Sequence, residues 1–406
     1  MDLWGAGVHP DKRLFFCNVD FDAGLASGCS PRQKKYCLEA QFYYFLCGSG
    51  RDRILVDAVP DPAYLPYLAE QGIDAPRRCC DGELLPEHVA DPWGWTASAV
   101  ERFHRHGAQI FRPPPDSVRK VNSRRFCHRV AARHDLGIAG STICESAGEA
   151  RRRIRRGRSF PLVLKPEHGN AGIGLVLVPS ADPAPEGGIG RLFSRNGAAA
   201  VVEPWVNRIA DISTRLVLDV GGRTVSTAHH RALNNRAGVY FGNMFESGDP
   251  VLEKWRSRLD AGAMAVSEEL HAEGYFGPAG LDWIVYTDDS TGDEACALVD
   301  INARQPMSFV AYCLRERLPA AGHCSFHLAP RRRYPGLTDY GSWYRGCGRN
   351  AYDPDRSTGI LLCTPLSYTV GQVRHRPMRH GFFIVANTRG EMLEYDRRLR
   401  TAFGKA

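Results

Sequence analysis

Two apolar stretches in the second half of the chain carry side chains that could hold a metal ion. GLDWIVYTD contains Asp282, and ALVDINARQP contains Asp300, Asn302 and Arg304. Alternate residues of a strand point to the same face, so the last three are expected to lie on one side. Carboxylate and amide oxygens are ligands that magnesium takes between protein and phosphates. An exposed sheet face would also carry alternating polar residues, but burying carboxylates without a cation is costly, so the pattern favours a magnesium site.

A second chemical centre is expected in FPLVLKPEHGNAGIGLVLV, residues 160 to 178. An apolar run ends in Lys165, a turn with Gly169, Gly172 and Gly174 follows, and a second strand-like run returns, which predicts a hairpin. Glycines let bare amide N–H groups approach an anion closely, as polyphosphate binding requires. It is not a Walker A loop, because no Gly-Lys-Ser/Thr follows. Taken alone, the stretch fits an ordinary hairpin equally well.

Between these centres, the segment AAAVVEPWVNRIADISTRLVL could contact a nucleotide base and ribose. Residues 198 to 202 are predicted to form a buried strand, and residues 203 to 206 a hinge that leaves it, because a proline follows Glu203. In a nucleotide site the hinge could present backbone groups to adenine, Trp205 and Val206 could pack against the base, and Asp211 could accept from ribose. The alternative is a loop with a buried tryptophan.

The elements that must position these residues follow an α/β pattern, and 406 residues fit two or three packed subdomains. Residues 1 to about 120 alternate predicted strands (14–19, 54–58) with predicted helices (33–46, 62–71). FRPPPD, residues 111 to 116, stiffens a connection and marks a boundary. The later predicted elements are a helix at 122–134, a strand near residue 142, a second helix, the hairpin, strands at 212–220 and from 224, a helix at 253–273, the strands of the metal pair, a glycine-rich aromatic loop at 340–352, strands at 360–364 and 382–386, and a helix at 390–403.

The composition is that of a soluble globular protein, with 43% hydrophobic and 24% charged residues. No stretch is long and apolar enough to span a bilayer, and the N-terminus lacks the pattern of a signal peptide, so no membrane association and a cytoplasmic location are expected. The 13 cysteines are odd in number and irregularly spaced, which favours reduced thiols. The net charge of +7 is spread over short clusters, so small anionic ligands suit it as well as nucleic acid.

Taken together, these features resemble the ATP-grasp superfamily of carboxylate–amine ligases. The resemblance covers residues 121 to about 330 and rests on four elements in the family's order: NSRR, LVLKPEHGNAGIG, VVEPWV and LD…DINAR. It implies a Rossmann-like N-terminal domain (1–118), an ATP-grasp small lobe (119–203), a large lobe with the metal site (204–330) and a small C-terminal α+β extension (331–406).

The resemblance also implies a role for each matching residue. Lys165 would contact the α- and β-phosphates, the loop at 169–174 would close over the triphosphate, and Arg304 would steady the transferred phosphoryl group. The other implied ligands are Glu203 to Val206 around adenine, Asp211 at the ribose, and Asp282, Asp300 and Asn302 around magnesium. Arg124 replaces the lysine of many relatives; it keeps the charge but adds a planar fork.

The expected function is therefore ATP-dependent joining of a small carboxylic acid or amino acid to an amine through an acyl phosphate. Arg231 and Arg215, on strands near the metal pair, could hold the acid or the γ-phosphate, or could form surface ion pairs. The expected cofactors are ATP and Mg²⁺, and the partners are small molecules, without nucleic acid. A homodimer is compatible with the sequence. A bicarbonate-activating enzyme similar to biotin carboxylase, and a non-catalytic nucleotide-binding protein, remain alternatives.

Overall fold

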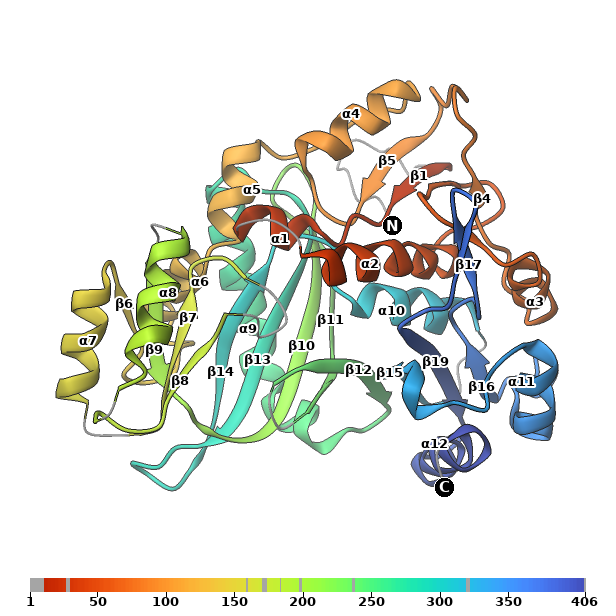
Figure 1. The fold of residues 1–406 in the computed structure, drawn as a ribbon. Coiled ribbons are helices and arrows are strands. Elements are labelled where there is room, and N and C mark those ends of the chain that lie inside the picture. Colours follow the sequence, from red (N-terminus) through yellow and green to blue (C-terminus); the bar gives the residue numbers. More distant parts are fainter. Residues whose placement is uncertain are drawn as a thin grey trace.

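The computed structural model describes residues 11–26, 30–157, 160–169, 174–182, 184–196, 199–235, 238–318 and 322–404. Figure 1 shows a small lobe at one end of the molecule, a large central sheet, and N- and C-terminal parts packed beside it. Gly172, one of the predicted glycines of the hairpin tip, lies outside the described residues. The described cysteines are free thiols, as the irregular spacing predicted.

The N-terminal part contains a parallel sheet in the strand order β4-β2-β1-β5. Its strands are β1 (Arg13–Phe16), β2 (Arg53–Leu55), β4 (Arg77–Arg78) and β5 (Val89–Pro92). The helices around it are α1 (Phe21–Ala26), α2 (Pro31–Ala40), the 3-10 helix η1 (Gln41–Leu46), α3 (Tyr64–Glu70) and α4 (Ala97–Arg105). β2 lies on one side of β1 and β5 on the other, so the strand order reverses at β1. The loops after β1 and β5 therefore border a topological switch point, where such sheets bind ligands.

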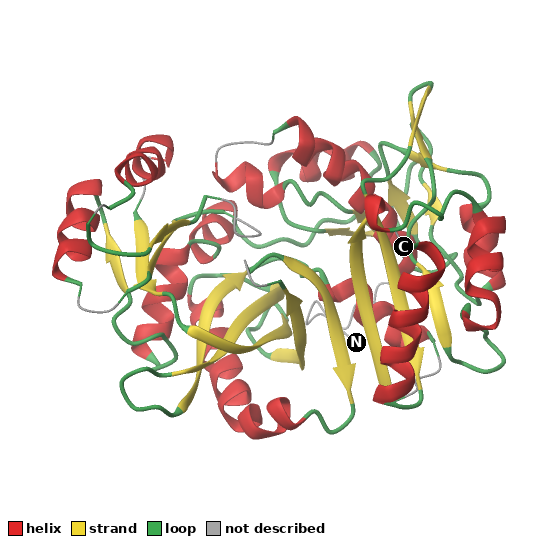
Figure 2. Ribbon diagram, turned by 60° about the horizontal axis from the view of Figure 1, so that its bottom comes forward, coloured by secondary structure: helices red, strands yellow, loops and turns green. Residues whose placement is uncertain are grey.

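The small lobe is an antiparallel sheet with the order β6-β9-β7-β8, covered by two helices (Figures 1 and 2). Its elements are β6 (Thr142–Cys144), α7 (Ala147–Arg156), β7 (Leu162–Pro166), β8 (Val176–Val178), α8 (Glu186–Asn196) and β9 (Ala200–Pro204). The hairpin of β7 and β8 confirms the prediction from the apolar runs. Glu203 differs from expectation: it lies within β9, which ends at Pro204, and pairs with Val163, so the hinge begins two residues later than predicted. Two further helices, α5 (Pro115–Val121) and α6 (Arg124–Arg133), precede the lobe.

The large sheet has eight strands in the order β14-β13-β10-β11-β12-β15-β19-β16. The strands are β10 (Asn207–Leu218), β11 (Thr224–Asn234), β12 (Tyr240–Glu246), β13 (Gly277–Thr287), β14 (Glu294–Asn302), β15 (His323–Pro330), β16 (Gly359–Leu362) and β19 (Arg379–Ala386). The long helix α9 (Pro250–Ala272) packs on β10 and β11, and α10 (Ser308–Arg317) lies between the sheet and the N-terminal part (Figure 1).

The C-terminal residues do not form a sheet of their own. β16 and β19 extend the large sheet, and β17 (Tyr368–Val370) joins β18 (Val373–His375) and β3 (Val59–Pro60) of the N-terminal part. The remaining elements are η2 (Arg331–Arg333), α11 (Tyr340–Cys347), η3 (Gly348–Asn350) and α12 (Arg389–Phe403). The prediction of a loop at 340–352 is wrong for the residues of α11. Asp339 and Ser342 form a capping box that starts this helix, and Trp343 is buried.

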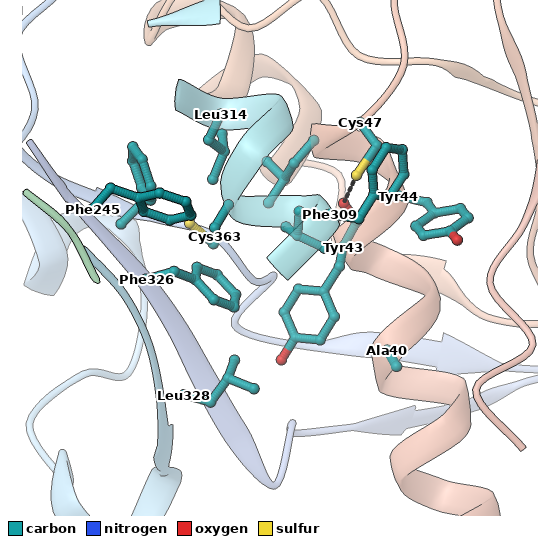
Figure 3. Close-up of a cluster of buried hydrophobic side chains, with 14 of the residues drawn as sticks. Ala40, Tyr43, Tyr44, Cys47, Phe245, Phe309, Leu314, Phe326, Leu328 and Cys363 are labelled. Atoms are coloured by element: carbon teal, nitrogen blue, oxygen red, sulfur yellow. Dashed lines mark hydrogen bonds between the residues drawn. The ribbon is translucent and has the colours of Figure 1, made fainter. Parts of the chain in front are cut away.

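A continuous aromatic core joins the N-terminal part to the large sheet. Tyr43 of η1 meets Phe326 of β15 edge-on at 6.0 Å, and Tyr44 meets Phe309 of α10 at 5.9 Å. Figure 3 shows these rings filling the space between η1, α10 and the strands. Aromatic contacts of this kind add to the free energy of burial, and here they fix α10 and the loop before it in one position.

Candidate active site

The predicted metal residues lie together at the edge of the large sheet. Asp282 of β13 pairs directly with Asp300 of β14, and residues paired across two strands project to the same face. One Asp282 oxygen accepts from the Asn302 amide at 3.0 Å, and the other accepts from the Ser213 hydroxyl at 3.2 Å. Burial, and then the negative charge of Asp300, raise the pKa of Asp282 to about 6. The face therefore carries two carboxylates that repel each other, as a site for a divalent cation requires.

Arg304 reaches this face from just beyond the strand, because β14 ends at Asn302. Its guanidinium donates to Asn302 Oδ1 at 3.0 Å and forms an ion pair with Asp22 at 2.8 Å, with a further hydrogen bond to Asp22 from Nε at 2.8 Å. It also lies over the Trp93 ring at 5.3 Å. Burial alone would lower the pKa of Arg304, but Asp22 and the metal-site carboxylates raise it. Asp22 and Trp93 follow β1 and β5, so the switch point of the N-terminal sheet opens onto this arginine.

Arg124 links the two lobes at the start of α6. Its side chain is buried and donates to the carbonyls of Pro166, at 2.8 Å, and Gly169, at 3.4 Å, and it lies 3.3 Å from an Asp300 oxygen. Ser123 caps the helix by accepting from the Phe126 amide. The predicted phosphate-binding arginine is thus held between the hairpin and the metal carboxylates.

Lys165 and Glu203 form an ion pair at the inner face of the small lobe, with side chains 12% and 9% exposed. They face the same side because Lys165 pairs with Val201, two residues before Glu203 on β9. Both, with Arg124, line a cavity of about 180 Å³ whose apolar walls come from Ile138, Val201, Leu298 and other residues. A charged end and an apolar end in one cavity suit a nucleotide, with phosphates toward the cations and the base against the apolar wall.

No family model matches the chain, and no curated protein resembles it in sequence. Solved structures match its fold over nearly its whole length. PurK, an N5-carboxyaminoimidazole ribonucleotide synthetase in complex with ADP, aligns with a TM-score of 0.57 at 12% identity and covers 96% of each chain. Biotin carboxylase of Campylobacter jejuni in complex with β-γ-ATP aligns with a TM-score of 0.54 at 14% identity, over 94% of this chain and 89% of that one.

The biotin carboxylase domain of a Hydrogenobacter thermophilus 2-oxoglutarate carboxylase, with magnesium ADP and bicarbonate, also aligns. Its TM-score is 0.54 at 11% identity, over 97% of this chain and 90% of that one. The chain has the ATP-grasp fold. This confirms the predicted fold class, in which the small lobe and the large sheet of an ATP-grasp domain follow a Rossmann-like region.

Within the ATP-grasp fold, some predicted residues lie at the edge of the site. Asp211 is two residues from Ser213 and shares the face of Asp282; it pairs with Arg208 at 3.2 Å, and burial raises the pKa of Asp211. Val206 packs against an apolar cluster that contains Ile138, one of the residues lining the cavity. The backbone amide of Trp205 donates to the Pro161 carbonyl at 2.9 Å.

The structure does not bring Arg231 together with the metal carboxylates. Arg231 pairs with Ile212, and Ile212 pairs with Trp283, so the three side chains project to the same face. This is the face of the large sheet that α9 covers. There it lies 3.5 Å from Asp249, the N-cap of α9. An ion pair at a helix N-terminus accounts for this residue.

Gly169 and Gly174 occupy the described ends of the hairpin tip. The Gly169 carbonyl accepts from Arg124, and Gly174 has a positive φ of 84°, a conformation that glycine adopts without strain. The sequence analysis assigned no role to Asp22, whose contact with Arg304 spans 282 residues. No local signal identifies such a partner.

The described residues contain no group of three or more His, Cys, Asp or Glu side chains that could hold a metal ion. The candidate cation site consists of two carboxylates and one amide, which is too few for a complete magnesium shell but suits an ion that also binds phosphate oxygens. Within the same described ranges, no helix combines the length and the apolar character that a membrane crossing needs.

Proposed function

We propose that the protein is an ATP-dependent carboxylate–amine ligase. The observation that carries this proposal is a chain of contacts between four separated segments. Arg124 of α6 and Lys165 of β7 line one cavity, and Arg124 lies 3.3 Å from Asp300 of β14. Arg304, from the loop beyond β14, donates to Asn302 on the face that carries Asp300. Neighbouring ATP-grasp structures contain ADP or ATP, and one contains magnesium ADP, which supports the same ligands here.

The residues fit a magnesium nucleotide. Asp282, Asp300 and Asn302 offer only oxygen ligands toward the cation, and burial, followed by the charge of Asp300, raises the pKa of Asp282 although Arg304 lowers it. When bound, the ion would neutralise the charge of the phosphates. Lys165 would bind the nucleotide phosphates in place of its contact with Glu203. Arg124 would keep the hairpin carbonyls of Pro166 and Gly169 close to Asp300.

The reaction would proceed in two displacements. A carboxylate oxygen of the acid attacks the γ-phosphorus, the bond to the β–γ bridging oxygen breaks, and ADP leaves. The amine nitrogen then attacks the acyl carbon, phosphate leaves with the electron pair, and the nitrogen loses a proton. Arg304 would stabilise the negative charge on the phosphoryl group, and the closed hairpin would exclude water from the acyl phosphate.

The test is ADP release with magnesium and ATP against a panel of acids and amines, followed by mass analysis of the product. Wild type should release ADP with one pair, and Asp300→Ala should not. Lys165→Ala would leave Glu203 unpaired, so the double variant Lys165→Gln with Glu203→Gln keeps the pair neutral while removing the cation. We expect a loss of about a hundredfold or more in kcat, whereas Lys254→Ala, at an exposed ion pair, should match wild type.

Failure of every acid–amine pair to release ADP, in a protein that ATP stabilises against unfolding, would refute the ligase and leave a nucleotide-binding protein. If ATP neither binds nor stabilises, the nucleotide site itself is refuted.

A second candidate is activation of bicarbonate as the acid. It is favoured because the matching structures include carboxylases, one of them with bicarbonate bound. Stimulation of ADP release by bicarbonate alone, with incorporation of labelled bicarbonate into an added amine, would support it. If bicarbonate has no effect where an organic acid stimulates release, this candidate is excluded.

A further inference from the structure

Beyond the metal face, one cation lies on the same side of the large sheet without a partner. Arg215 of β10 forms no hydrogen bond and no ion pair with the described residues, and its Nε atom is buried. Burial lowers the pKa of Arg215, although a guanidinium stays charged at any physiological pH. An uncompensated buried charge is costly, so a negative group is expected beside it.

Arg215 is oriented toward the reacting centre by the register of three strands. It pairs with Gly280, which pairs with Asn302, so all three share the face of Asp282. Two strand spacings place the Arg215 backbone roughly 10 Å from that of Asn302. Gly280 has no side chain, and Pro306 of the loop before α10 occupies the space over it, because a Cβ at Gly280 would lie 3.0 Å from Pro306 Cβ.

Two aromatic rings lie against the Arg215 guanidinium. Its guanidinium carbon lies 5.3 Å from the centre of the Phe309 ring and 5.8 Å from that of Tyr312. Phe309 contacts Tyr44, Tyr44 lies 6.4 Å from Trp93, and Trp93 underlies Arg304. Figure 3 shows Tyr44 and Phe309 in the buried cluster between η1 and α10. A row of aromatic contacts therefore runs from Arg215 to Arg304, the predicted phosphoryl-transfer arginine.

Residues in this row of contacts, or close to Phe309 in the sequence, carry buried polar atoms that lack hydrogen-bond partners within the described part of the chain. They are Tyr44 Oη, Trp93 Nε1, Gln305 Oε1, Ser308 Oγ, Tyr312 Oη and Arg215 Nε. Tyr44, Trp93, Gln305 and Ser308 are each 3% exposed or less. Buried polar groups are normally satisfied, so a cluster of this kind indicates bound water or a bound ligand. Most of these atoms are donors or hydroxyls, which suits an anion.

Asp91, whose charge raises the pKa of Arg215, does not form an ion pair with it. Asp91 of β5 lies 3.6 Å from Arg13 and accepts from Gln305 at 3.5 Å, and no Asp91 oxygen comes within ion-pair distance of Arg215. Arg215 thus remains available for a group from outside the chain.

We propose that the surroundings of the Arg215 guanidinium, named here the aromatic chamber after Phe309, Tyr312, Tyr44 and Trp93, bind a second carboxylate of the acid substrate, so that the preferred acid is a dicarboxylate. The inference rests on the proposed ligase function: one carboxylate lies at Arg304 and the metal face for activation, and the other lies against Arg215. A planar guanidinium binds a carboxylate through two parallel hydrogen bonds, and the indole and hydroxyl donors complete its shell. The chamber would therefore select the substrate without entering the chemical step.

Binding can be measured without catalysis. Thermal unfolding of the full chain, without ATP, would be followed with L-aspartate, L-glutamate and succinate, each against its monoamide: L-asparagine, L-glutamine and succinamate. We expect at least one diacid to raise Tm more than its monoamide, and Arg215→Met to remove the difference. Arg256→Met, at an exposed helical arginine, is the matched control and should keep it.

In the ADP-release assay, Arg215→Met should raise KM for the diacid roughly ten- to hundredfold with little change in kcat, because a charge-assisted hydrogen bond is lost in the ground state as well as in the transition state. Should Arg215→Met fail to fold, Arg215→Lys keeps the charge and Trp93→Phe removes one donor only. Each should reduce the preference for the diacid over the monoamide.

The outcomes separate this inference from the ligase proposal. If diacids and monoamides act alike on wild type, or if their difference survives in every chamber variant, the second-carboxylate site is refuted even where ADP release stands. If a diacid stabilises the protein through Arg215 but no acid stimulates ADP release, the anion site stands and the ligase is refuted.

Discussion

Substituting Asp282 by asparagine should stabilise the metal-free protein. Its carboxyl faces Asp300 across the β13–β14 pair, and burial and that charge raise its pKa from 3.8 to about 6. The folded state therefore binds more protons than the unfolded chain between about pH 4 and pH 6. The free energy of unfolding falls as pH rises through this window and stays lowered above it, where the carboxylate is ionised.

The size of the effect follows from the shift. A difference of roughly two pKa units corresponds to about 3 kcal/mol at neutral pH and above. Because Asp282 keeps some exposure, solvent screening reduces this, and we expect a gain of about 1–3 kcal/mol for Asp282→Asn. The amide can keep both contacts: its oxygen accepts from Asn302, and its nitrogen donates to the Ser213 hydroxyl, which retains its own proton for other partners.

Urea unfolding with chelator at about pH 4 and about pH 8 would measure this, since the stabilisation should be present at pH 8 and absent at pH 4. Asp289→Asn, in the exposed turn between the same strands, removes the same charge and should change little. With magnesium and a non-hydrolysable ATP analogue, wild type should gain stability and Asp282→Asn should not. A variant that is less stable than wild type at pH 8 without metal would refute the argument that burial and the charge of Asp300 destabilise the ionised Asp282 carboxylate.

Two further substitutions test the contacts that hold the site. Asp22→Asn removes the ion pair with Arg304, so kcat of ADP release should fall about tenfold or more with KM for ATP nearly unchanged; an equal rise in KM for ATP would argue against a role confined to Arg304. Gly262→Val in α9 should destabilise the protein by about 1–3 kcal/mol in urea unfolding, because a Cβ at this position would lie 2.5 Å from the Trp283 ring. Met264→Val, 64% exposed on the same helix, is its control, and equal stabilities of the two variants would contradict the packing argument.

Much of the fold could be predicted from the sequence because its signals are local. Apolar runs and glycine at the turn located β7 and β8, and the spacing of apolar residues located α9 within three residues at its N-terminus. The alternation in ALVDINARQP predicted that Asp300 and Asn302 share a face, and the register places both beside β13, with Asp300 opposite Asp282. Arg304 follows the strand instead of lying on it, since β14 ends two residues earlier.

Elements stabilised by distant contacts could not be predicted in this way. Glycine and aromatic residues at 340–352 favoured a loop, yet Trp343 of α11 stacks on Phe382 and on Phe403, from β19 and α12, at 6.0 and 5.7 Å. The joining of β16 and β19 to the large sheet is also a pairing between distant segments. Both depend on tertiary packing, which overrides local preference.

The same limit decides between the two arginines near the metal pair. Arg215 lies on β10, beside β13, and Arg231 lies on β11, beside β10. Residue type alone gives no reason to prefer either arginine as a substrate contact. Side chains alternate between the two faces of a sheet, so a shift of one residue in register would exchange their environments. The observed pairing of Arg215 with Gly280 sets it on the face of Asp282, and the pairing of Arg231 with Ile212 sets it against α9 and Asp249. The choice between a substrate contact and a structural ion pair thus depends on register, which only the folded chain defines.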